Sequence, residues 1–179
     1  MRHGPTEWSR DHRHTSVTDL PLLPEGEEAA RDLAPRLSGT RFAAVLTSPR
    51  TRARRTAELA GFPDAETDED LAEWAYGDYE GVTTEQIRES VPGWTVWTHP
   101  CPGGESAAQV AARLDRVVAR VRSLDGPVLL FGHGHALRVL AARWLGLEAA
   151  DGRHLRLDTA TVSVLGHERE TPVVQRWNS

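Results

Sequence analysis

Residues 126–147 read GPVLLFGHGHALRVLAARWLGL, and this stretch predicts a strand, a tight loop and a helix in succession. Val128–Phe131 is a short apolar run between Gly-Pro and the turn Gly132–Gly134, which is typical of a buried strand. The apolar residues that follow have helical spacing, and Gly146 is a suitable end for that helix. Residues 42–62, FAAVLTSPRTRARRTAELAGF, repeat the same order of elements. Two such units in one chain favour a parallel sheet.

The unit at residues 42–62 shows how the loop after a strand is built. Its apolar run, Phe42 to Leu46, breaks at Thr47, and the helix that follows ends near Gly61. Ser48 is a plausible N-cap and Pro49 a natural first helical residue. This loop is expected to point backbone N–H groups at whatever lies above the strand, which favours an anion there.

The remaining segments alternate between helical and extended patterns. A helical signal covers residues 21–39, but Pro35 lies inside it and is expected to kink or divide the helix. Two capping boxes, at Thr83–Gln86 and Ser106–Gln109, each predict the start of a helix. The second helix is amphipathic, with apolar residues at Val110, Leu114, Val117 and Val121 and arginines expected on a solvated face at Arg113, Arg116, Arg120 and Arg122. Residues 159–168 and 171–179 are rich in β-formers and are expected to pair as a hairpin.

These elements predict an α/β fold, a three-layer α/β/α sandwich with a mostly parallel central sheet. A length of 179 residues suits one domain, so we expect residues 1–179 to form a single unit. Ligands of such sheets bind on loops after the carboxyl ends of strands. Three loops are candidates: the N-terminal Arg2-His3-Gly4, Thr47–Arg52, and Gly132–His135.

Composition excludes several classes of function. The chain has 21 Arg, no Lys and 26 acidic residues, giving a formal net charge of −5, so no nucleic-acid or membrane partner is expected. No apolar run approaches the roughly 20 residues that span a bilayer. Cys101 is the single cysteine, which excludes an intrachain disulfide and suits a cytoplasmic location. We expect a monomer or a homodimer.

The side chains on the three loops suit a compact dianion. They include two imidazoles and several guanidiniums, which match phosphate oxygens bidentately and stay charged at any working pH. A P-loop is excluded because the chain has no Lys, and GHGHAL lacks the third glycine of a dinucleotide fingerprint. The residues concerned are His3, His133, Arg2, Arg50 and Arg52. A metal site at His133 and His135 has no third ligand nearby, so no metal is expected.

Five motifs in order then resemble one family. RHGPTEW at residues 2–8 is similar to the R-H-G-x-T-x-W signature of the histidine phosphatase superfamily, which has the phosphoglycerate mutase-like fold. LTSPRTRARRTA, LAEWAYGDYEG, PGGES and GHGHALRVLAARWLG resemble its further motifs. The resemblance implies a phosphohistidine mechanism without metal or cofactor, in which His3 is the nucleophile. It also implies that Glu73 is the proton donor, that His133 is the second catalytic histidine, and that Arg2, Arg52 and His133 bind phosphate.

The branch of the family is a separate question. RDHRHTSVTDLPLLPEG, residues 10–26, resembles small bacterial phosphatases, which implies hydrolysis of a small phosphorylated metabolite such as a sugar phosphate. Ser9 stands where the mutases usually have Asn, and Ser9, His14 and Arg50 are possible substrate contacts. A mutase-type phosphotransferase and a silent phospho-ligand binding module remain alternatives. Glu80 and Asp78 are rivals of Glu73 for the proton-donor role.

The start of the chain departs from the family pattern. Relatives have an apolar strand directly before RHG, whereas here only Met1 precedes the motif. We therefore expect the N-terminal strand to be missing or truncated, because either further residues belong upstream or the sheet tolerates a gap. Unpaired backbone groups beside that gap are expected to make this chain less stable than an extended one.

Overall fold

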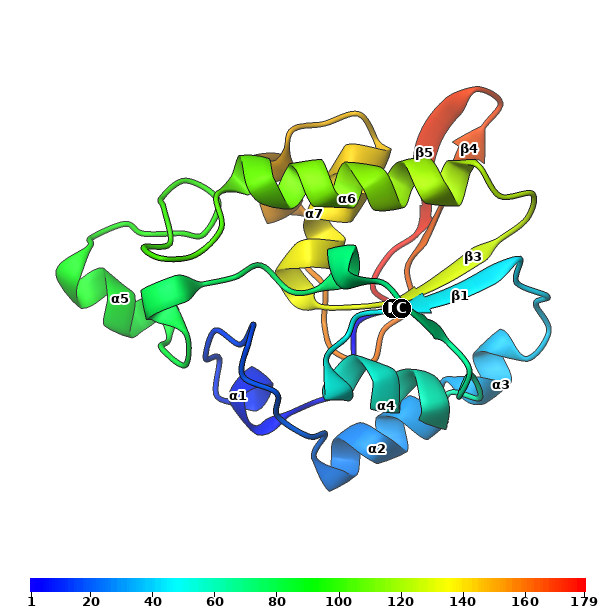
Figure 1. The fold of residues 1–179 in the computed structure, drawn as a ribbon, viewed down its shortest axis with the longest axis horizontal. Helices are drawn as coiled ribbons and strands as arrows, with labels where there is room; N and C mark the ends of the chain where they lie inside the picture. The colour runs from blue at the N-terminus through cyan, green and yellow to red at the C-terminus, as the bar shows by residue number, and fades with distance from the viewer.

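A computed structural model describes all 179 residues (Figure 1). A parallel sheet in the order β2-β1-β3 forms its centre, and a separate antiparallel hairpin, β4-β5, comes from the end of the chain. The strands are β1 (Ala44–Thr47), β2 (Glu66–Thr67), β3 (Val128–Phe131), β4 (Val164–Glu168) and β5 (Thr171–Arg176). The strand at Val128–Phe131, the parallel pairing and the terminal hairpin are as the sequence predicts.

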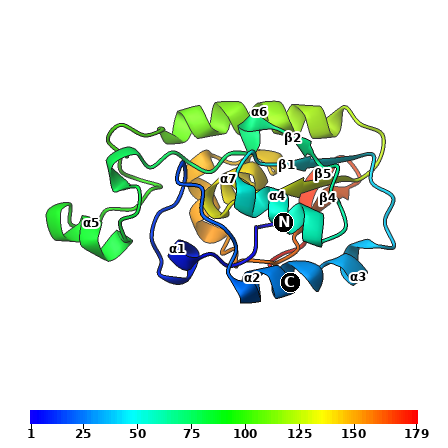
Figure 2. The same ribbon diagram turned by 60° about the horizontal axis from the view of Figure 1, so that its bottom comes forward.

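Helices cover both faces of this sheet. Figures 1 and 2 show α6 and α7 on one side of β1 and β3, with the early helices on the other. The helices of the first face are α6 (Ala107–Arg122) and α7 (Gly134–Trp144), and those of the second are α2 (Pro24–Arg31), α3 (Ala34–Leu37) and α4 (Thr51–Leu59). The predicted three-layer sandwich is confirmed.

The burial of β3 explains why its sequence is apolar throughout. Leu129 and Phe131 pack into a cluster with the helices of the second face, whereas Val128 and Leu130 pack against the larger cluster under α6 and α7. Successive residues of a strand point to opposite faces, so a strand covered on both sides needs apolar residues at every position. This strand ends directly at Gly132 and the loop that carries His133.

Shorter elements gather at the carboxyl ends of β1 and β3. Figure 1 shows α1 and α5 at the end of the molecule toward which these strands point. The shorter elements are α1 (Glu7–Arg10), α5 (Thr84–Ser90) and three 3-10 turns at Glu69–Leu71, Gly77–Tyr79 and Ala149–His154. The two predicted capping boxes, at Thr83–Gln86 and Ser106–Gln109, are both formed. The loops expected to bind a ligand therefore lie under a cap of short segments.

Two predictions about helices have different outcomes. Pro35 does divide its helix: α2 ends at Arg31, and α3 begins at Ala34 with Pro35 in its first turn. The predicted start of α4 at Ser48 and Pro49 is wrong, because the helix begins at Thr51. The Ser48 hydroxyl makes a different contact, with His133, which is described below.

The first three residues pair with β3. Met1 donates its terminal N–H to the Leu130 carbonyl at 2.7 Å, and Gly132 N–H donates to the Met1 carbonyl at 3.0 Å. The N–H of His3 donates to the Gly132 carbonyl at 3.0 Å, and Arg2 and Gly132 form a parallel bridge. Beyond Met1, along the same edge of β3, lies an apolar groove of about 760 Å³ that reaches β4.

Filling that groove should stabilise the fold. A chain with five or six added Val and Ile residues before Met1 is expected to melt several degrees higher, because the added residues can pair with β3 and bury apolar surface. Each fully buried aliphatic side chain contributes about 1.5–3 kcal/mol. Thermal unfolding followed by circular dichroism measures the shift, with a Gly/Ser extension of equal length as the control. Equal melting temperatures for the two extended chains would contradict the expectation.

Candidate active site

Parallel pairing brings the three candidate loops together. His3 follows the Arg2–Gly132 bridge, His133 follows β3, and Ser48 follows β1. Because these segments run in the same direction, their carboxyl ends meet at one edge of the sheet. The two imidazoles are buried, and their ring centroids lie 5.2 Å apart.

The His3 ring is held in one orientation. Its Nδ1 lies 2.7 Å from the Gly4 carbonyl and donates to it, which leaves Nε2 without a proton and free of hydrogen bonds. Burial, followed by the charges of Arg52 and Arg2, holds the pKa of His3 well below its ordinary value. The neutral form of the ring is therefore favoured, and its unprotonated nitrogen is available in the residue that lines the pocket.

Gly4 allows this arrangement because it touches another backbone. A Cβ at position 4 would lie 2.5 Å from the carbonyl oxygen of Gly26 in α2, so no other residue fits without displacement. The Gly4 N–H also donates to the Thr56 hydroxyl at 3.0 Å, and that hydroxyl donates to the Arg52 carbonyl at 2.7 Å. The nucleophile candidate is thus fixed by contacts to both α2 and α4.

His133 is oriented by Ser48. The Ser48 hydroxyl oxygen lies 2.6 Å from His133 Nε2 and accepts the Arg50 N–H at 3.3 Å. Its own proton can then go to Nε2, and in that arrangement the ring proton of His133 lies on Nδ1. That Nδ1 is buried and has no hydrogen-bond partner. Burial, with the charges of Arg52 and His3 nearby, also keeps the pKa of His133 well below its ordinary value.

Four buried donors in this region are unsatisfied. They are the Nε atoms of Arg2, Arg50 and Arg52 and the Nδ1 of His133. An unsatisfied buried polar group costs about 1–3 kcal/mol, more when it is charged, and native proteins rarely leave one without a reason. Four together indicate a site built for an anion.

Arg52 is the most enclosed of these cations. Its side chain is fully buried, and its two terminal nitrogens donate to the carbonyls of Thr15, Ser16 and Thr18 at 3.0–3.2 Å. The nearest carboxylate oxygen, from Asp19, is 3.9 Å away. Burial lowers the pKa of Arg52, but a guanidinium remains charged at working pH. The same contacts hold the loop of residues 15–18 against the site.

Glu73 lies at the N-terminus of α7. It is buried and accepts three backbone N–H groups, from Trp74 at 2.9 Å, His135 at 3.1 Å and Ala136 at 2.8 Å. These bonds fix the carboxyl group on the wall of the pocket that also holds His3. Its two rivals do not reach that pocket. Glu80 accepts hydrogen bonds from Ser16 and Thr18, and Asp78 is exposed.

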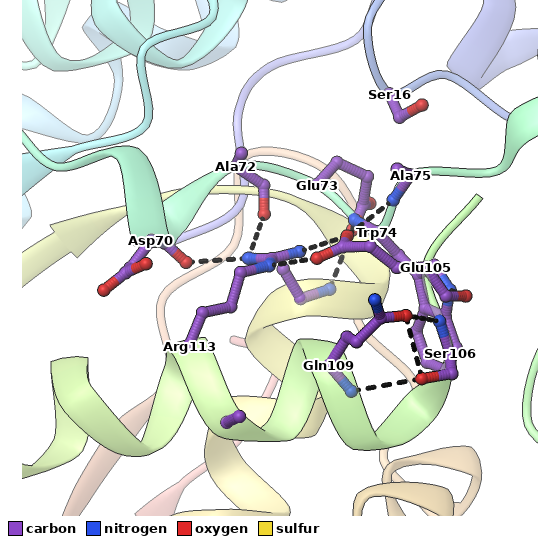
Figure 3. Close-up of polar contacts among 12 residues, drawn as sticks. Ser16, Asp70, Ala72, Glu73, Trp74, Ala75, Glu105, Ser106, Gln109 and Arg113 are labelled. Atoms are coloured by element: carbon purple, nitrogen blue, oxygen red, sulfur yellow. Dashed lines mark hydrogen bonds and ion pairs between the residues drawn. The ribbon is translucent and has the colours of Figure 1, made fainter. Parts of the chain in front are cut away.

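A second set of contacts supports the segment that carries Glu73 (Figure 3). Arg113 pairs with Glu105 at 2.8 Å and donates to the carbonyls of Asp70 and Ala72, both at 2.7 Å. Glu105 in turn accepts the Ala75 N–H at 2.8 Å. The prediction of a solvated face is wrong for Arg113, which is buried. Arg113 follows the buried Val110 by three residues, and this helical spacing indicated that it lies on the buried face of α6.

A pocket of about 240 Å³ opens beside His3 and Glu73. Ser9 and His14 both line it, although the Ser9 hydroxyl already serves the capping box of α1. His14 is buried, and its Nδ1 donates to the Val82 carbonyl at 2.7 Å. Sequence reasoning gave no role to Tyr76 or Arg138, which also line the pocket. Both residues lie inside the family motifs quoted above, and this position in a motif could have marked them as pocket residues.

No three His, Cys, Asp or Glu side chains come together as metal ligands would. No helix is both long enough and apolar enough to cross a membrane.

The chain is similar to known proteins over its whole length. Residues 1–179 match the family model of the histidine phosphatase superfamily, branch 1. The chain is similar to an acid phosphatase of Mycobacterium tuberculosis, with 45% identity over 175 residues, covering 94% of this chain and 85% of that protein. It is 37% identical over 180 residues to sedoheptulose 1,7-bisphosphatase of Saccharomyces cerevisiae, covering 82% of this chain and 66% of the yeast protein.

A solved structure gives the same result for the fold. The structure of an open reading frame from Mycobacterium tuberculosis superposes with a TM-score of 0.94 and 42% identity, covering 99% of this chain and 94% of that one. The match of the family model over the whole length, with these relatives, shows that the chain belongs to the histidine phosphatase superfamily.

Proposed function

We propose that this protein hydrolyses phosphate monoesters of small metabolites, such as sugar phosphates, through a phosphohistidine on His3. One observation carries the proposal: four buried, unpaired donors from Arg2, Arg50, Arg52 and His133 adjoin an imidazole with a free Nε2. A phosphoryl group would satisfy these donors. The names of the relatives, an acid phosphatase and a sedoheptulose 1,7-bisphosphatase, support the same reaction and substrate class.

The first step transfers the phosphoryl group to the protein. The Nε2 lone pair of His3 forms a bond to phosphorus while the bond from phosphorus to the ester oxygen breaks and leaves its electrons on that oxygen. Arg2, Arg50 and Arg52, with Nδ1–H of His133, balance the charge on the other phosphoryl oxygens. The lowered pKa of His3 favours the form in which this nitrogen carries no proton.

Glu73 manages the protons of both steps. Its carboxyl group protonates the leaving alkoxide, and the resulting carboxylate then takes a proton from the water that attacks phosphorus. The bond between phosphorus and nitrogen breaks, its electrons return to Nε2, and inorganic phosphate leaves. The three backbone N–H groups hold the carboxyl in place for this role.

The two alternatives make different demands on the chain. A silent binding module would be expected to lack His3, Glu73 or Arg52, and all three are present. A mutase would return the phosphoryl group to a second organic hydroxyl rather than to water. Stoichiometric release of inorganic phosphate, measured against substrate consumed, separates hydrolysis from transfer.

The nucleophile is tested by His3→Asn. In this variant the rate of phosphate release from an aryl phosphate, assayed with EDTA present, is expected to fall by at least about a thousandfold, because no covalent intermediate can form. After an alkaline quench, mass spectrometry should find a phosphoryl group on His3 of the protein without the substitution and none on the variant. His167→Asn, at an exposed position of β4, is the matched control. Full activity in the His3 variant would refute the proposed reaction.

The proton donor is tested by comparing two leaving groups. Glu73→Gln should lower kcat by about a hundredfold or more for a sugar phosphate, whose alkoxide needs a proton to leave. The loss should be much smaller for an aryl phosphate, whose phenolate is a good leaving group. Glu85→Gln, on an exposed face of α5, is the control. Equal losses for both substrates would remove Glu73 from this role.

Ser48 is a positioning residue for His133 and has its own test. Ser48→Ala should let the imidazole proton redistribute between its nitrogens and lower kcat by about ten- to a hundredfold. Nitrogen-15 NMR of the His133 ring reports the tautomer directly, and Ser123→Ala is the exposed control. An unchanged tautomer together with an unchanged kcat would contradict the assignment.

A further inference from the structure

Glu80 is a half-buried carboxylate that pairs with no cation, although it accepts four hydrogen bonds. Its Oε1 accepts the N–H groups of Ser16 at 2.9 Å and Thr18 at 3.0 Å, and its Oε2 accepts the N–H of Ser16 at 3.0 Å and the Ser16 hydroxyl. Burial raises the pKa of Glu80, but these hydrogen bonds outweigh that effect and hold the pKa below its ordinary value. The carboxylate therefore directs its charge at one loop, residues 15–18.

The opposite side of the same loop faces Arg52. The carbonyls of Thr15, Ser16 and Thr18 accept from its guanidinium at 3.1, 3.2 and 3.0 Å. The peptide group between residues 15 and 16 takes part in both sets of bonds. Its C=O accepts from Arg52, and its N–H donates to Glu80. Because the C=O and N–H of a trans peptide point in opposite directions, this peptide group lies between a buried cation and a carboxylate and is aligned from one to the other.

This alignment stabilises the buried guanidinium. Arg52 is fully buried, and the nearest carboxylate oxygen, from Asp19, is 3.9 Å away. A charge buried in this way is stable only when hydrogen-bond partners surround it. An ionised group on one side of a peptide polarises it, and successive hydrogen bonds strengthen one another. The charge of Glu80 therefore strengthens the bonds from the loop to Arg52 without contacting that residue.

Hydrogen bonds, rather than packing, hold the loop. Val17, in its middle, is 58% exposed. Within residues 15–18, most side-chain contacts go to Arg52 or Glu80. Beyond the loop, Asp19 accepts the N–H and the hydroxyl of Thr51, at the start of α4. The position of the loop thus depends chiefly on one carboxylate and one guanidinium.

The loop also decides which edge of Arg52 is left for a ligand. Its Nη1 and Nη2 donate to the loop carbonyls, whereas its Nε is buried and has no partner. A guanidinium is planar, so fixing two of its nitrogens sets the direction of the third. In the proposed reaction this Nε–H is one of the donors that the phosphoryl group satisfies. A shift of the loop would turn that donor away from phosphate.

We propose that Glu80 is a positioning residue for Arg52. Acting through the loop of residues 15–18, it fixes the guanidinium so that Nε–H is directed at the phosphoryl group. Glu80 then strengthens phosphate binding without contacting the substrate, since it does not line the pocket. This inference rests on the proposed function, because it takes Arg52 as a phosphate ligand.

Glu80→Gln tests this role with little change of shape. The amide removes the charge and presents an NH2 group to the N–H donors of the loop, so the loop should hold Arg52 less firmly. The inhibition constant of inorganic phosphate, measured against an aryl phosphate, should rise about tenfold, and kcat/KM should fall by a similar factor. Glu89→Gln, at an exposed position of α5, is the control. An unchanged inhibition constant would overturn the proposal.

A double-mutant cycle separates positioning from a general loss of structure. Arg52→Lys keeps the positive charge but loses the planar fork, and should itself raise the inhibition constant about tenfold or more. Because Glu80 acts through Arg52, adding Glu80→Gln to Arg52→Lys should raise the constant by less than about twofold further. A full further tenfold rise would show that the two residues act independently, which would overturn the proposal.

Ser16→Ala is the second variant, and it leaves Glu80 in place. It removes only the hydroxyl bond to Glu80, so the inhibition constant should rise about two- to threefold, again without adding to the effect of Arg52→Lys. Thermal unfolding followed by circular dichroism checks that each variant is folded. An inhibition constant unchanged by Arg52→Lys would refute the phosphate site of the proposed function. A loss with Arg52→Lys, but none with Glu80→Gln or Ser16→Ala, would refute only the role of Glu80.

Discussion

The parallel pairing of residues 1–3 with β3 is the interaction on which the site depends. The bonds from Gly132 to Met1 and from His3 to Gly132 set the two backbones in register. That register brings two histidines, 130 residues apart in the sequence, to a ring separation of 5.2 Å. The Ser48 bond to His133 depends in turn on the parallel pairing of β1 with β3, which places the third loop beside the second.

A second constraint is electrostatic. The site concentrates guanidinium groups and keeps both imidazoles neutral, because burial and the neighbouring cations disfavour a further positive charge. The fold tolerates the unsatisfied donors because the loops around them are tied elsewhere: Arg52 to the carbonyls of residues 15–18, Arg113 to those of residues 70 and 72. The free energy of those bonds helps to offset the cost of burying these donors without partners in the protein.

Much of this arrangement could be predicted from the sequence, since it follows from local patterns. The apolar run of β3, the capping boxes and Pro35 each act over a few residues, and the structure contains all of them as expected. The motifs also placed His3, His133 and Glu73 on the loops that meet. What local patterns could not give was the partner of a polar side chain. Ser48 is a residue type typical of an N-cap, yet its hydroxyl makes a hydrogen bond with a histidine 85 residues away in the sequence.

The same limit applies to Arg113 and Arg138. Both lie on helices at positions where an arginine usually faces water, and only the packing of distant segments encloses them. Arg113 is covered by the segment that carries Glu73, and Arg138 by Trp97 and the turn at Gly152. A helical pattern predicts which face is apolar, but it does not predict which long polar side chain will be drawn under a neighbouring loop.

The contact between Gly4 and Gly26 has a consequence for how this protein tolerates change. Gly26 lies inside α2, where glycine is a poor helix former, and a Cβ there would lie 2.3 Å from the Pro5 carbonyl oxygen. The position of the nucleophile candidate is therefore tied to a helix that contributes no side chain to the chemistry. An inherited change at residue 26 would act as an active-site lesion, although it lies outside the signature motif by which such enzymes are recognised.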